Sequence, residues 1–410
     1  MNLYFDLKGQ YWLKVGDRFV ALGKDDVKLH AIRNGVTDKP EQNLTAIESL
    51  FWRAQTFRVV NYAGPLAGHR TGLVERTSGE RLLVTDECNL FTRSLSPGKP
   101  FPFIEGFIEA LFEDGHEHVI AWLAGAVKSL LRGDFAPGQM LALCGPPACG
   151  KSFFHYLVTQ LLGGRMAKPY PYLTGKTAFN GDLARAEHLV IEDEAASSDI
   201  RARRNFGSML KQFTVAEEMH VHDKGKIAFT APTFKRLTLS VNDEVQNLMI
   251  LPPLDESIRD KVMLLRCRDA KGKLREDRQA NKDAVAKELP AFTAFLKRYR
   301  VPKRIVCPRF GVTAFHNAAL CDAIGETDDD RRVLDMVDHV LRGHYQDGEW
   351  QGTAAELEAM IRQSAYRDVA GKVFYYPSAC GVELGKLAAR IPGRFRCVTI
   401  RGRKEWRVQQ

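Results

Sequence analysis

The sequence lacks the features of membrane, secreted and zinc-stabilised proteins. It has no run of about 18 or more apolar residues, and residues 1–14 lack the charged start and apolar core of a signal peptide. The eight cysteines are scattered, with no C-x-x-C pair and no Cys/His cluster at the spacing of metal ligands. We therefore expect a soluble cytoplasmic protein with free thiols, no structural zinc and no membrane partner.

The first hundred residues also lack the acidic catalytic pattern of a primase or polymerase. Short β-type runs at the N-terminus are followed by a helix-forming stretch that Asn43 or Thr45 would cap. Residues 97–102 (PGKPFP) predict a linker. We expect a small α/β accessory domain over residues 1–104, with the rest of the chain carrying the main activity.

What the chain has instead is an excess of positive charge. Lys and Arg number 59 against 50 Asp and Glu in 410 residues, a formal net charge of +9. Such an excess suits either a polyanionic partner or a basic solvated surface, so the location of the charge must decide between them. With 45% hydrophobic residues, the chain is long enough for two or three domains with their own cores.

Residues 141–157, LALCGPPACGKSFFHYL, contain the pattern G-x-x-x-x-G-K-[ST] between an apolar run and a stretch at helical spacing. Strand, loop and helix form the context in which this pattern binds phosphate. Backbone N–H groups surround the oxygens, the lysine reaches the β and γ phosphates, and the serine hydroxyl binds Mg²⁺. The sequence thus predicts ATP and Mg²⁺ as cofactors. The predicted nucleotide-binding residues are Gly145, Pro146, Pro147, Ala148, Cys149, Gly150, Lys151 and Ser152, and Ser152 is also a predicted metal ligand.

Two further apolar runs end in polar residues. Residues 188–191 lead into Glu192-Asp193-Glu194, and residues 236–241 (RLTLSV) lead into Asn242. We assign Asp193 to the metal and Glu194 to activation of the attacking water; a register shift of one residue would bring in Glu192. The Asn242 amide would position that water. Such residues also occur in ordinary turns, but their order and separation favour hydrolysis.

The order GPPACGKS, LVIEDEA, a KGK turn and RLTLSVN resembles the superfamily 3 helicases, above all the helicase part of phage, plasmid and satellite-element primase-helicases. The similarity covers residues 121–267 and, more faintly, 309–316. It implies an α/β fold with an AAA+ P-loop ATPase core, a parallel sheet between helices, over residues 105–300. It also implies a homo-hexamer or similar ring that moves along single-stranded or forked DNA during replication of a mobile element. An origin, and a separately encoded primase or polymerase, are further partners that the resemblance leaves open.

In that family a β-hairpin binds the nucleic-acid backbone. It precedes the strand that leads into the water-positioning amide, which in this sequence is the strand 236–241 before Asn242. Here residues 219–234 (MHVHDKGKIAFTAPTF) predict arms at 221–222 and 227–229 around a turn. Lys224 and Lys226 stand at its tip, with His222 beside them. A lysine ammonium binds phosphate regardless of base, as a sliding contact requires. Without the neighbouring motifs, a solvated surface hairpin would be the better explanation of the pattern; with them, the nucleic-acid contact is favoured.

The resemblance also implies an arginine that reaches the γ phosphate of a neighbouring subunit. In the segment DESIRDKVMLLRC the best candidate is Arg259. Related proteins often have adjacent arginines at this place, whereas here Asp260 and Lys261 follow Arg259, so Lys261 is the alternative candidate. A monomer would then be nearly inactive. Four more cations lie on a helix that either lines an interface or faces water: Arg201, Arg203, Arg204 and Lys211.

Residues 301–410 contain three helical stretches followed by two strands. Thr327 and Thr353 precede the first two helices, the third covers 378–391, and RFRCVTI and EWRV flank the turn at 401–404. This pattern predicts a winged helix, which presents a helix and a hairpin to DNA. Residues 386–410 hold eight cations and one acid, which favours DNA over a protein partner. The predicted contacts are Lys386, Arg390, Arg401, Arg403 and Lys404.

Two other functions fit the same motifs. An AAA+ ATPase that remodels protein–DNA complexes would hydrolyse ATP under DNA stimulation but would not separate strands. A DNA-binding regulator that uses ATP only to oligomerise would bind one site through residues 330–410 and show negligible turnover.

Overall fold

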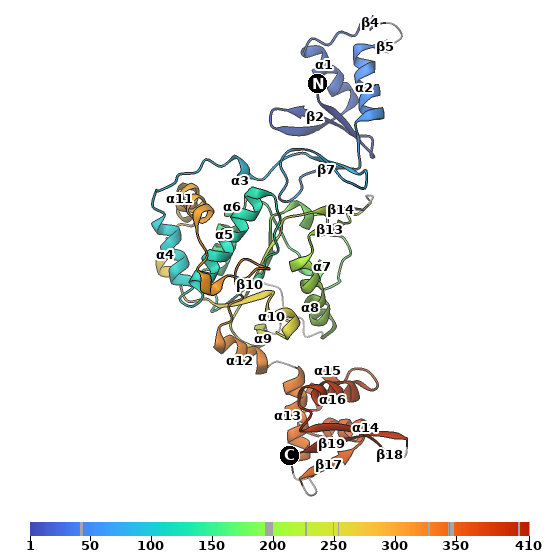
Figure 1. Ribbon diagram of the computed structural model, residues 1–410, viewed down its shortest axis with the longest axis vertical. Helices are drawn as coiled ribbons and strands as arrows, with labels where there is room; N and C mark the ends of the chain where they lie inside the picture. The colour runs from blue at the N-terminus through green and yellow to red at the C-terminus, as the bar shows by residue number, and fades with distance from the viewer. Residues whose placement is uncertain are drawn as a thin grey trace. The chain divides into compact units, whose positions relative to one another are not determined.

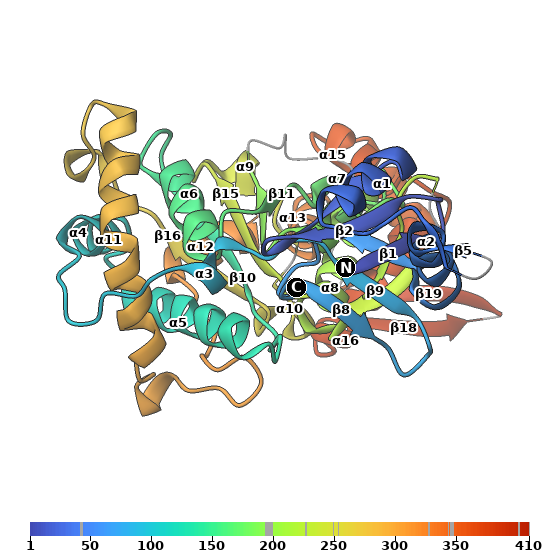
Figure 2. The same ribbon diagram turned by 90° about the horizontal axis from the view of Figure 1, so that it is seen from above.

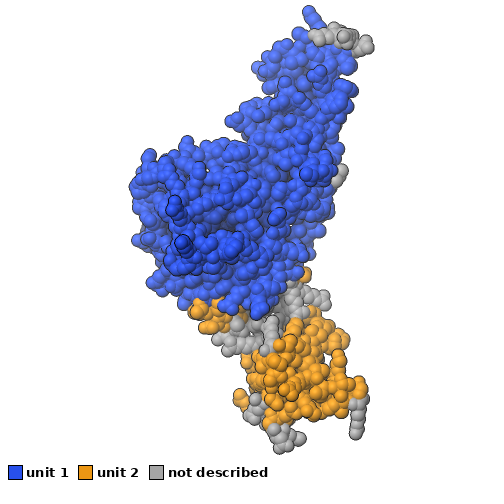
Figure 3. All heavy atoms as spheres, viewed as in Figure 1, with its two compact units in different colours: residues 1–194, 208–242, 254–317 blue, residues 195–207, 243–253, 318–410 orange. Residues whose placement is uncertain are grey.

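The computed structural model describes residues 1–41, 44–192, 200–225, 228–248, 250–252, 254–326, 329–342, 344, 348–400 and 402–409. It divides into two compact units (Figure 3). Unit 1 comprises residues 1–194, 208–242 and 254–317; unit 2 comprises residues 195–207, 243–253 and 318–410. The predicted boundaries at residues 104 and 300 stay predictions.

A five-stranded parallel sheet lies at the centre of unit 1 (Figures 1 and 2). In spatial order its strands are β11 Met166–Ala167, β12 His188–Ile191, β15 Arg236–Val241, β10 Met140–Cys144 and β16 Val262–Arg266. Almost every residue of the four longer strands is buried, as parallel strands covered on both faces require. The parallel sheet and the three strands predicted at 140–144, 188–191 and 236–241 are confirmed.

Four helices share one hydrophobic core with β10 and β16. They are α4 Pro102–Leu111, α5 His116–Arg132, α6 Lys151–Leu161 and α11 Arg278–Arg298, which lie near one another in Figure 2. The predicted apolar stripe of α5 is buried, and each large side chain removed from water stabilises the fold by about 1.5–3 kcal/mol. Trp122 Nε1 also donates to Gln139 O at 2.9 Å, which ties α5 to the start of β10.

The remaining elements of residues 89–326 are short apart from one helix. They are α3 Asn89–Thr92, α7 Tyr170–Leu173, α8 Ile200–Val215, β13 Glu218–Val221, β14 Phe229–Pro232, α9 Val245–Leu248, α10 Glu256–Arg259 and α12 Ala318–Glu326. Three 3-10 turns complete this part: Leu183–Arg185, Lys271–Lys273 and Lys303–Ile305. Residues 301–317 belong to unit 1, where His316 forms a parallel bridge with Leu264 of β16.

The described part of the first 85 residues forms three small sheets of unit 1. One has the order β3-β2-β1-β6 and packs against two helices, the second has the order β7-β9-β8, and the third is the pair β4-β5. The strands are β1 Leu3–Asp6, β2 Tyr11–Val15, β3 Arg18–Leu22, β4 Pro40–Glu41, β5 Leu44–Thr45, β6 Val59–Val60, β7 Tyr62–Gly64, β8 Gly72–Glu75 and β9 Arg81–Val84, and the helices are α1 Lys24–Arg33 and α2 Ala46–Phe57. Thr45 caps α2 in a reciprocal capping box with Glu48, which confirms one of the two predicted caps. The other candidate, Asn43, lies outside the described residues.

In unit 2, residues 329–409 form helices around a three-stranded antiparallel sheet of order β17-β19-β18. The elements are α13 Asp329–Leu341, β17 Glu349–Gly352, α14 Ala354–Arg362, α15 Arg367–Val373, α16 Ala379–Arg390, β18 Phe395–Ile400 and β19 Arg403–Gln409. The helix after Thr353, the helix at 378–391 and the two final strands are confirmed. Strand β17 and helix α15 were not predicted, and Thr327 lies outside the described residues.

All eight cysteines are free thiols. None of the helices in the described part of the chain combines the length and apolar character that crossing a membrane requires.

Candidate functional site

The glycine-rich loop joins the end of β10 to the start of α6. Gly145 must be glycine, because a Cβ there would stand 2.5 Å from the backbone O of Cys267. Two later residues have left-handed backbone conformations, with φ of 57° at Ala148 and 118° at Gly150. Left-handed residues in such a loop let successive N–H groups converge into a concavity that accepts anions.

The Lys151 ammonium is held inside this loop. Its Nζ donates to the backbone oxygens of Gly145 at 2.7 Å and Pro146 at 2.8 Å, and to Asn242 Oδ1 at 3.2 Å. Two predicted site residues are thus in contact, because β10 and β15 are adjacent parallel strands that end at the same edge of the sheet. The three oxygen acceptors are uncharged, so the positive charge is available to an anionic ligand.

The start of α6 completes a set of donors suited to phosphate. Gly150 is its N-cap, and no side chain caps the first turn, so its N–H groups can bond to the oxygens of a ligand. Ser152 is exposed, as are Pro146, Pro147 and Ala148, whereas Cys149 is buried. The residues present therefore fit a nucleoside polyphosphate, with the Ser152 hydroxyl accessible to a metal bound to it.

The acidic segment begins where β12 ends. Glu192 is half-buried and directly follows Ile191, while Asp193 and Glu194 lie outside the described residues. Strand β15 lies between β12 and β10, with Ile191 paired to Leu239. Glu192 therefore follows a strand that is adjacent to β15, and Asn242 directly follows β15.

A closed ring of hydrogen bonds lies between α6, β12 and β15. The Thr159 hydroxyl donates to His155 O at 2.9 Å and therefore accepts from His188 Nδ1 at 2.7 Å. His188 Nε2 then accepts from the Thr238 hydroxyl at 2.8 Å, and Thr238 accepts from His155 Nδ1 at 2.7 Å. Burial lowers the pKa of His188 well below its ordinary value of 6.5 and keeps it neutral. No sequence pattern indicated this network, because its members lie on three separate elements.

The predicted hairpin is present, with arms displaced from those expected. Strands β13 and β14 pair antiparallel from Glu218↔Pro232 to Val221↔Phe229, so the arms are longer than predicted. Lys224 is exposed in the turn and Gly225 has a φ of 71°; Lys226 lies outside the described residues.

One asparagine that belongs to no sequence motif, Asn180, holds the hairpin in place. The Asn180 side chain donates to His220 O at 2.8 Å and accepts from His222 N at 2.7 Å, and its N–H donates to His222 O at 3.0 Å. The His222 ring also lies against Phe179, with centroids 5.0 Å apart. His222 thus has packing partners on one side, which a solvated surface hairpin would not require.

Arg259 and Lys261 have different environments. Arg259 ends α10, and its side chain is exposed. Lys261 is 8% exposed and donates to Ser257 O at 2.8 Å and to the Asp260 carboxylate at 2.6 Å. A buried cation paired within its own chain is poorly placed to reach a neighbouring subunit, so the structure favours Arg259 of the two.

Some cations of residues 386–410 are paired with acids that lie outside this range in the sequence. Lys386 donates to both carboxylate oxygens of Glu383, at 2.6 and 2.7 Å, and Arg394 pairs with Asp338. Glu383 and Asp338 precede residue 386 in the sequence, but in the folded chain they contact Lys386 and Arg394. Lys386 is therefore a weaker candidate for a phosphate contact than its sequence position indicated.

Other cations of this segment face solvent. Arg403 and Lys404 are exposed where β19 begins, and Arg396 is exposed on β18. Arg401 and the Arg390 side chain lie outside what the structure describes. The described part of the β18–β19 hairpin thus offers three exposed cations.

Comparison with known proteins agrees with this architecture. A model of a family of unknown function, DUF5906, matches residues 143–259, which contain the loop, the hairpin and Arg259. The apo structure of the NrS-1 C-terminal region (305-718) has a TM-score of 0.60 and 12% identity, covering 100% of this chain and 95% of that one. An A-form apo structure of that region gives 0.58 and 13%, with 100% and 96% covered. These likenesses show a shared fold.

A chain described as "SCCmec type IV Cch - active helicase" has a TM-score of 0.35 and 12% identity, over 96% of this chain and 73% of its own. No curated protein matches the sequence.

Proposed function

We propose that the protein is an ATP- and Mg²⁺-dependent DNA helicase of the superfamily 3 type, with an AAA+ core. It assembles as a hexamer or similar ring and moves along single-stranded DNA in the replication of a phage, plasmid or other mobile element. Mg²⁺, held by Ser152 and Asp193, would neutralise charge on the phosphates during hydrolysis. Glu194 would activate the attacking water.

The contact between Lys151 Nζ and Asn242 Oδ1 at 3.2 Å carries this proposal. It brings together the lysine for the phosphates and an amide able to orient a water at the same edge of the sheet. A loop that only bound nucleotide would not need an amide from a second strand. Glu192, which introduces the acidic segment, follows the neighbouring strand and supports the same chemistry.

The hairpin supports movement along nucleic acid. Lys224 is exposed at a turn whose base Asn180 holds by three hydrogen bonds, so a charge at the tip stands on a rigid support. The helices and the β18–β19 hairpin of unit 2 support a winged-helix function, with DNA contacts through Arg403 and Lys404.

Strand separation of a forked DNA duplex tests the proposal. Purified protein with ATP and Mg²⁺ is compared with Lys151→Ala, Lys224→Ala and Lys287→Ala, an exposed lysine of α11 that serves as the matched control. We expect Lys151→Ala to lose hydrolysis about 100-fold or more. Lys224→Ala should hydrolyse ATP without unwinding, and Lys287→Ala should behave as wild type.

Two results would overturn the proposal in different ways. DNA-stimulated hydrolysis without unwinding, on tails of either polarity, would favour the ATPase that remodels protein–DNA complexes. Binding of one DNA site with negligible turnover would favour the ATP-gated regulator.

A further inference from the structure

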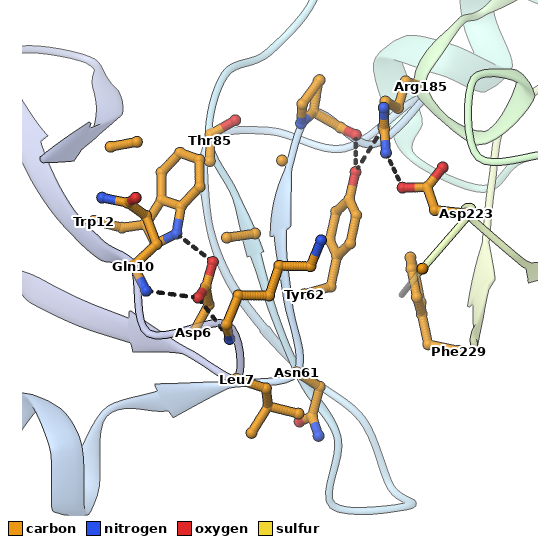
Figure 4. A pocket seen from close by; sticks show the side chains of 16 residues that line it. Asp6, Leu7, Gln10, Trp12, Asn61, Tyr62, Thr85, Arg185, Asp223 and Phe229 are labelled. Carbon is orange, nitrogen blue, oxygen red and sulfur yellow. Dashed lines mark hydrogen bonds and ion pairs between the residues drawn. The ribbon is translucent and has the colours of Figure 1, made fainter. Parts of the chain in front are cut away.

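Unit 1 contains a hollow of about 640 Å³ beside the turn of the hairpin (Figure 4). Its volume lies in the range of small-ligand sites. The walls come from β1, β2 and the turn between them, from residues 61–65, and from the hairpin. Neither the sequence motifs nor the nucleotide loop account for this hollow.

Three aromatic rings line the hollow, and contacts hold each ring in place. Trp12 Nε1 donates to Asp6 Oδ2 at 2.9 Å. Tyr62 Oη donates to Pro65 O at 2.7 Å, and the centroids of the Tyr62 and Phe229 rings are 4.5 Å apart. Figure 4 shows Trp12 on one side of the hollow and Tyr62 with Phe229 on the other. Rigid rings on opposite walls suit a flat, aromatic ligand.

The polar groups in the walls suit a nucleotide unit. Asn61 is exposed, and its Oδ1 accepts from Arg81 N at 2.8 Å, which leaves its NH₂ group for the edge of a base. Lys8 is exposed and lines the hollow, where it can meet a phosphate.

The two carboxylates of the hollow already have partners. Asp6 accepts from the backbone N–H groups of Lys8 at 2.9 Å and Gln10 at 3.0 Å, as well as from Trp12. Asp223 is paired with Arg185. The Arg185 guanidinium therefore offsets the charge of Asp223, whereas the Asp6 carboxylate keeps its charge and is stabilised by three uncharged N–H donors.

We propose that this hollow binds a nucleobase of a single strand whose phosphates contact the hairpin turn. Gly225 lines the hollow and directly follows Lys224, so the tip cation and the base site are neighbours in the chain. Stacking on aromatic rings is tolerant of sequence, which suits a strand that passes the site. The inference rests on the proposed function, because Lys224 is the phosphate contact in both.

Binding of a fluorescent single-stranded oligonucleotide to the full chain tests this site. Trp12→Leu should weaken binding about tenfold by removing a stacking ring, and Lys8→Glu should weaken it and reduce its salt dependence. The matched controls are Trp52→Leu, an exposed ring of α2, and Lys39→Glu, an exposed lysine; neither lines the hollow, and both should bind as wild type. Because Trp12→Leu can disturb folding, ultraviolet cross-linking of a 5-iodouracil oligonucleotide to wild-type protein provides a second readout, expected on Trp12 or Tyr62.

The outcomes separate the two proposals. If wild type binds no oligonucleotide, the proposed function fails. If Lys224→Ala weakens binding while Trp12→Leu and Lys8→Glu do not, and no cross-link forms in the hollow, only the base site is wrong. If dTMP alone blocks the cross-link at the concentration at which the oligonucleotide does, the ligand is a free mononucleotide and the strand proposal is overturned.

Discussion

Gly145 and Lys151 show how narrowly single residues determine the nucleotide loop. Glycine at 145 lets the loop pass the backbone of Cys267, and the left-handed Gly150 precedes the helix that carries Lys151. The left-handed conformation of Gly150 is a local requirement, whereas glycine at 145 is required by packing of the loop against the backbone of Cys267. The spacing of the motif predicts the loop, and the fold adds this close contact.

Gly145→Ala tests the steric requirement. The new methyl group would stand 2.5 Å from Cys267 O, and a backbone atom cannot rotate away. We expect the free energy of unfolding to fall by about 1–3 kcal/mol and the affinity for ATP to fall with it. The control is Gly125→Ala in α5, where a Cβ meets nothing within 4 Å, and where alanine should stabilise the helix by up to about 1 kcal/mol. Thermal melts with and without ATP measure both effects, and an unchanged Gly145→Ala protein would contradict the account.

His188 makes stability depend on pH. Its pKa in the fold lies well below the ordinary value of 6.5, so below that pH the unfolded chain binds a proton that the folded protein does not. Stability should therefore fall as pH drops from 7 toward 5.5, with up to about 1.4 kcal/mol per pH unit from this group. His188→Gln should show a smaller slope in urea unfolding, and the exposed control His344→Gln the wild-type slope. Equal slopes for His188→Gln and wild type would refute the assignment.

At the scale of elements, pairing between distant segments determines what each motif can do. The hairpin of β13 and β14 has a sequence signature, but Asn180 bonds to its first arm beside the turn, and Asp223 in the turn is paired with Arg185. Gly181 lies so close that a Cβ there would overlap the Asp223 carboxylate. The position of the hairpin thus depends on a loop that no motif identified.

Asn180→Ala should loosen the hairpin without touching the nucleotide loop. It removes the two side-chain hydrogen bonds, to His220 O and from His222 N, and each lost bond costs about 0.5–1.5 kcal/mol or more when its partner stays buried. We expect faster hydrogen exchange of the β13 and β14 amides, near-normal basal ATP hydrolysis and weaker unwinding. Asn34→Ala, which removes a hydrogen bond at the end of α1, is the control. Unchanged exchange in the hairpin would show that Asn180 does not hold it.

At the scale of the whole molecule, the proposed ring requires residues from two copies of the chain. Lys151 is enclosed by its own loop, whereas Arg259 is exposed at the end of α10. An exposed arginine that follows β15 in the sequence could act on the nucleotide of a neighbouring subunit, as arginines do in phosphoryl-transfer enzymes. Activity would then belong to the assembly.

Mixing two inactive variants tests this division. Lys151→Ala and Arg259→Ala should each lose most hydrolysis, but an equimolar mixture should recover part of it, because an intact loop can then lie beside an intact arginine. A mixture of Lys151→Ala with the Lys151→Ala, Arg259→Ala double variant should recover nothing. If mixed assemblies form by native mass spectrometry yet hydrolysis does not return, Arg259 does not act between subunits.

The parts of the protein that depend on residue spacing along the chain could be predicted from the sequence. The loop at 145–152, the strands that end at Cys144, Ile191 and Val241, and the helix capped by Thr353 follow from local sterics, hydrophobic runs and capping. The hairpin was predicted with its arms displaced, because strand pairing extends beyond the residues with a turn signature.

Which residues come into contact could not be predicted in this way, because folding brings distant segments together. The contact of Lys151 with Asn242, the support of the hairpin by Asn180 and the pairing of Lys386 with Glu383 are made by folding. The hollow beside Trp12 likewise has walls from segments that are far apart in the sequence. Charge neutralisation, burial and cavities depend on distances in space, which residue spacing along the chain does not specify.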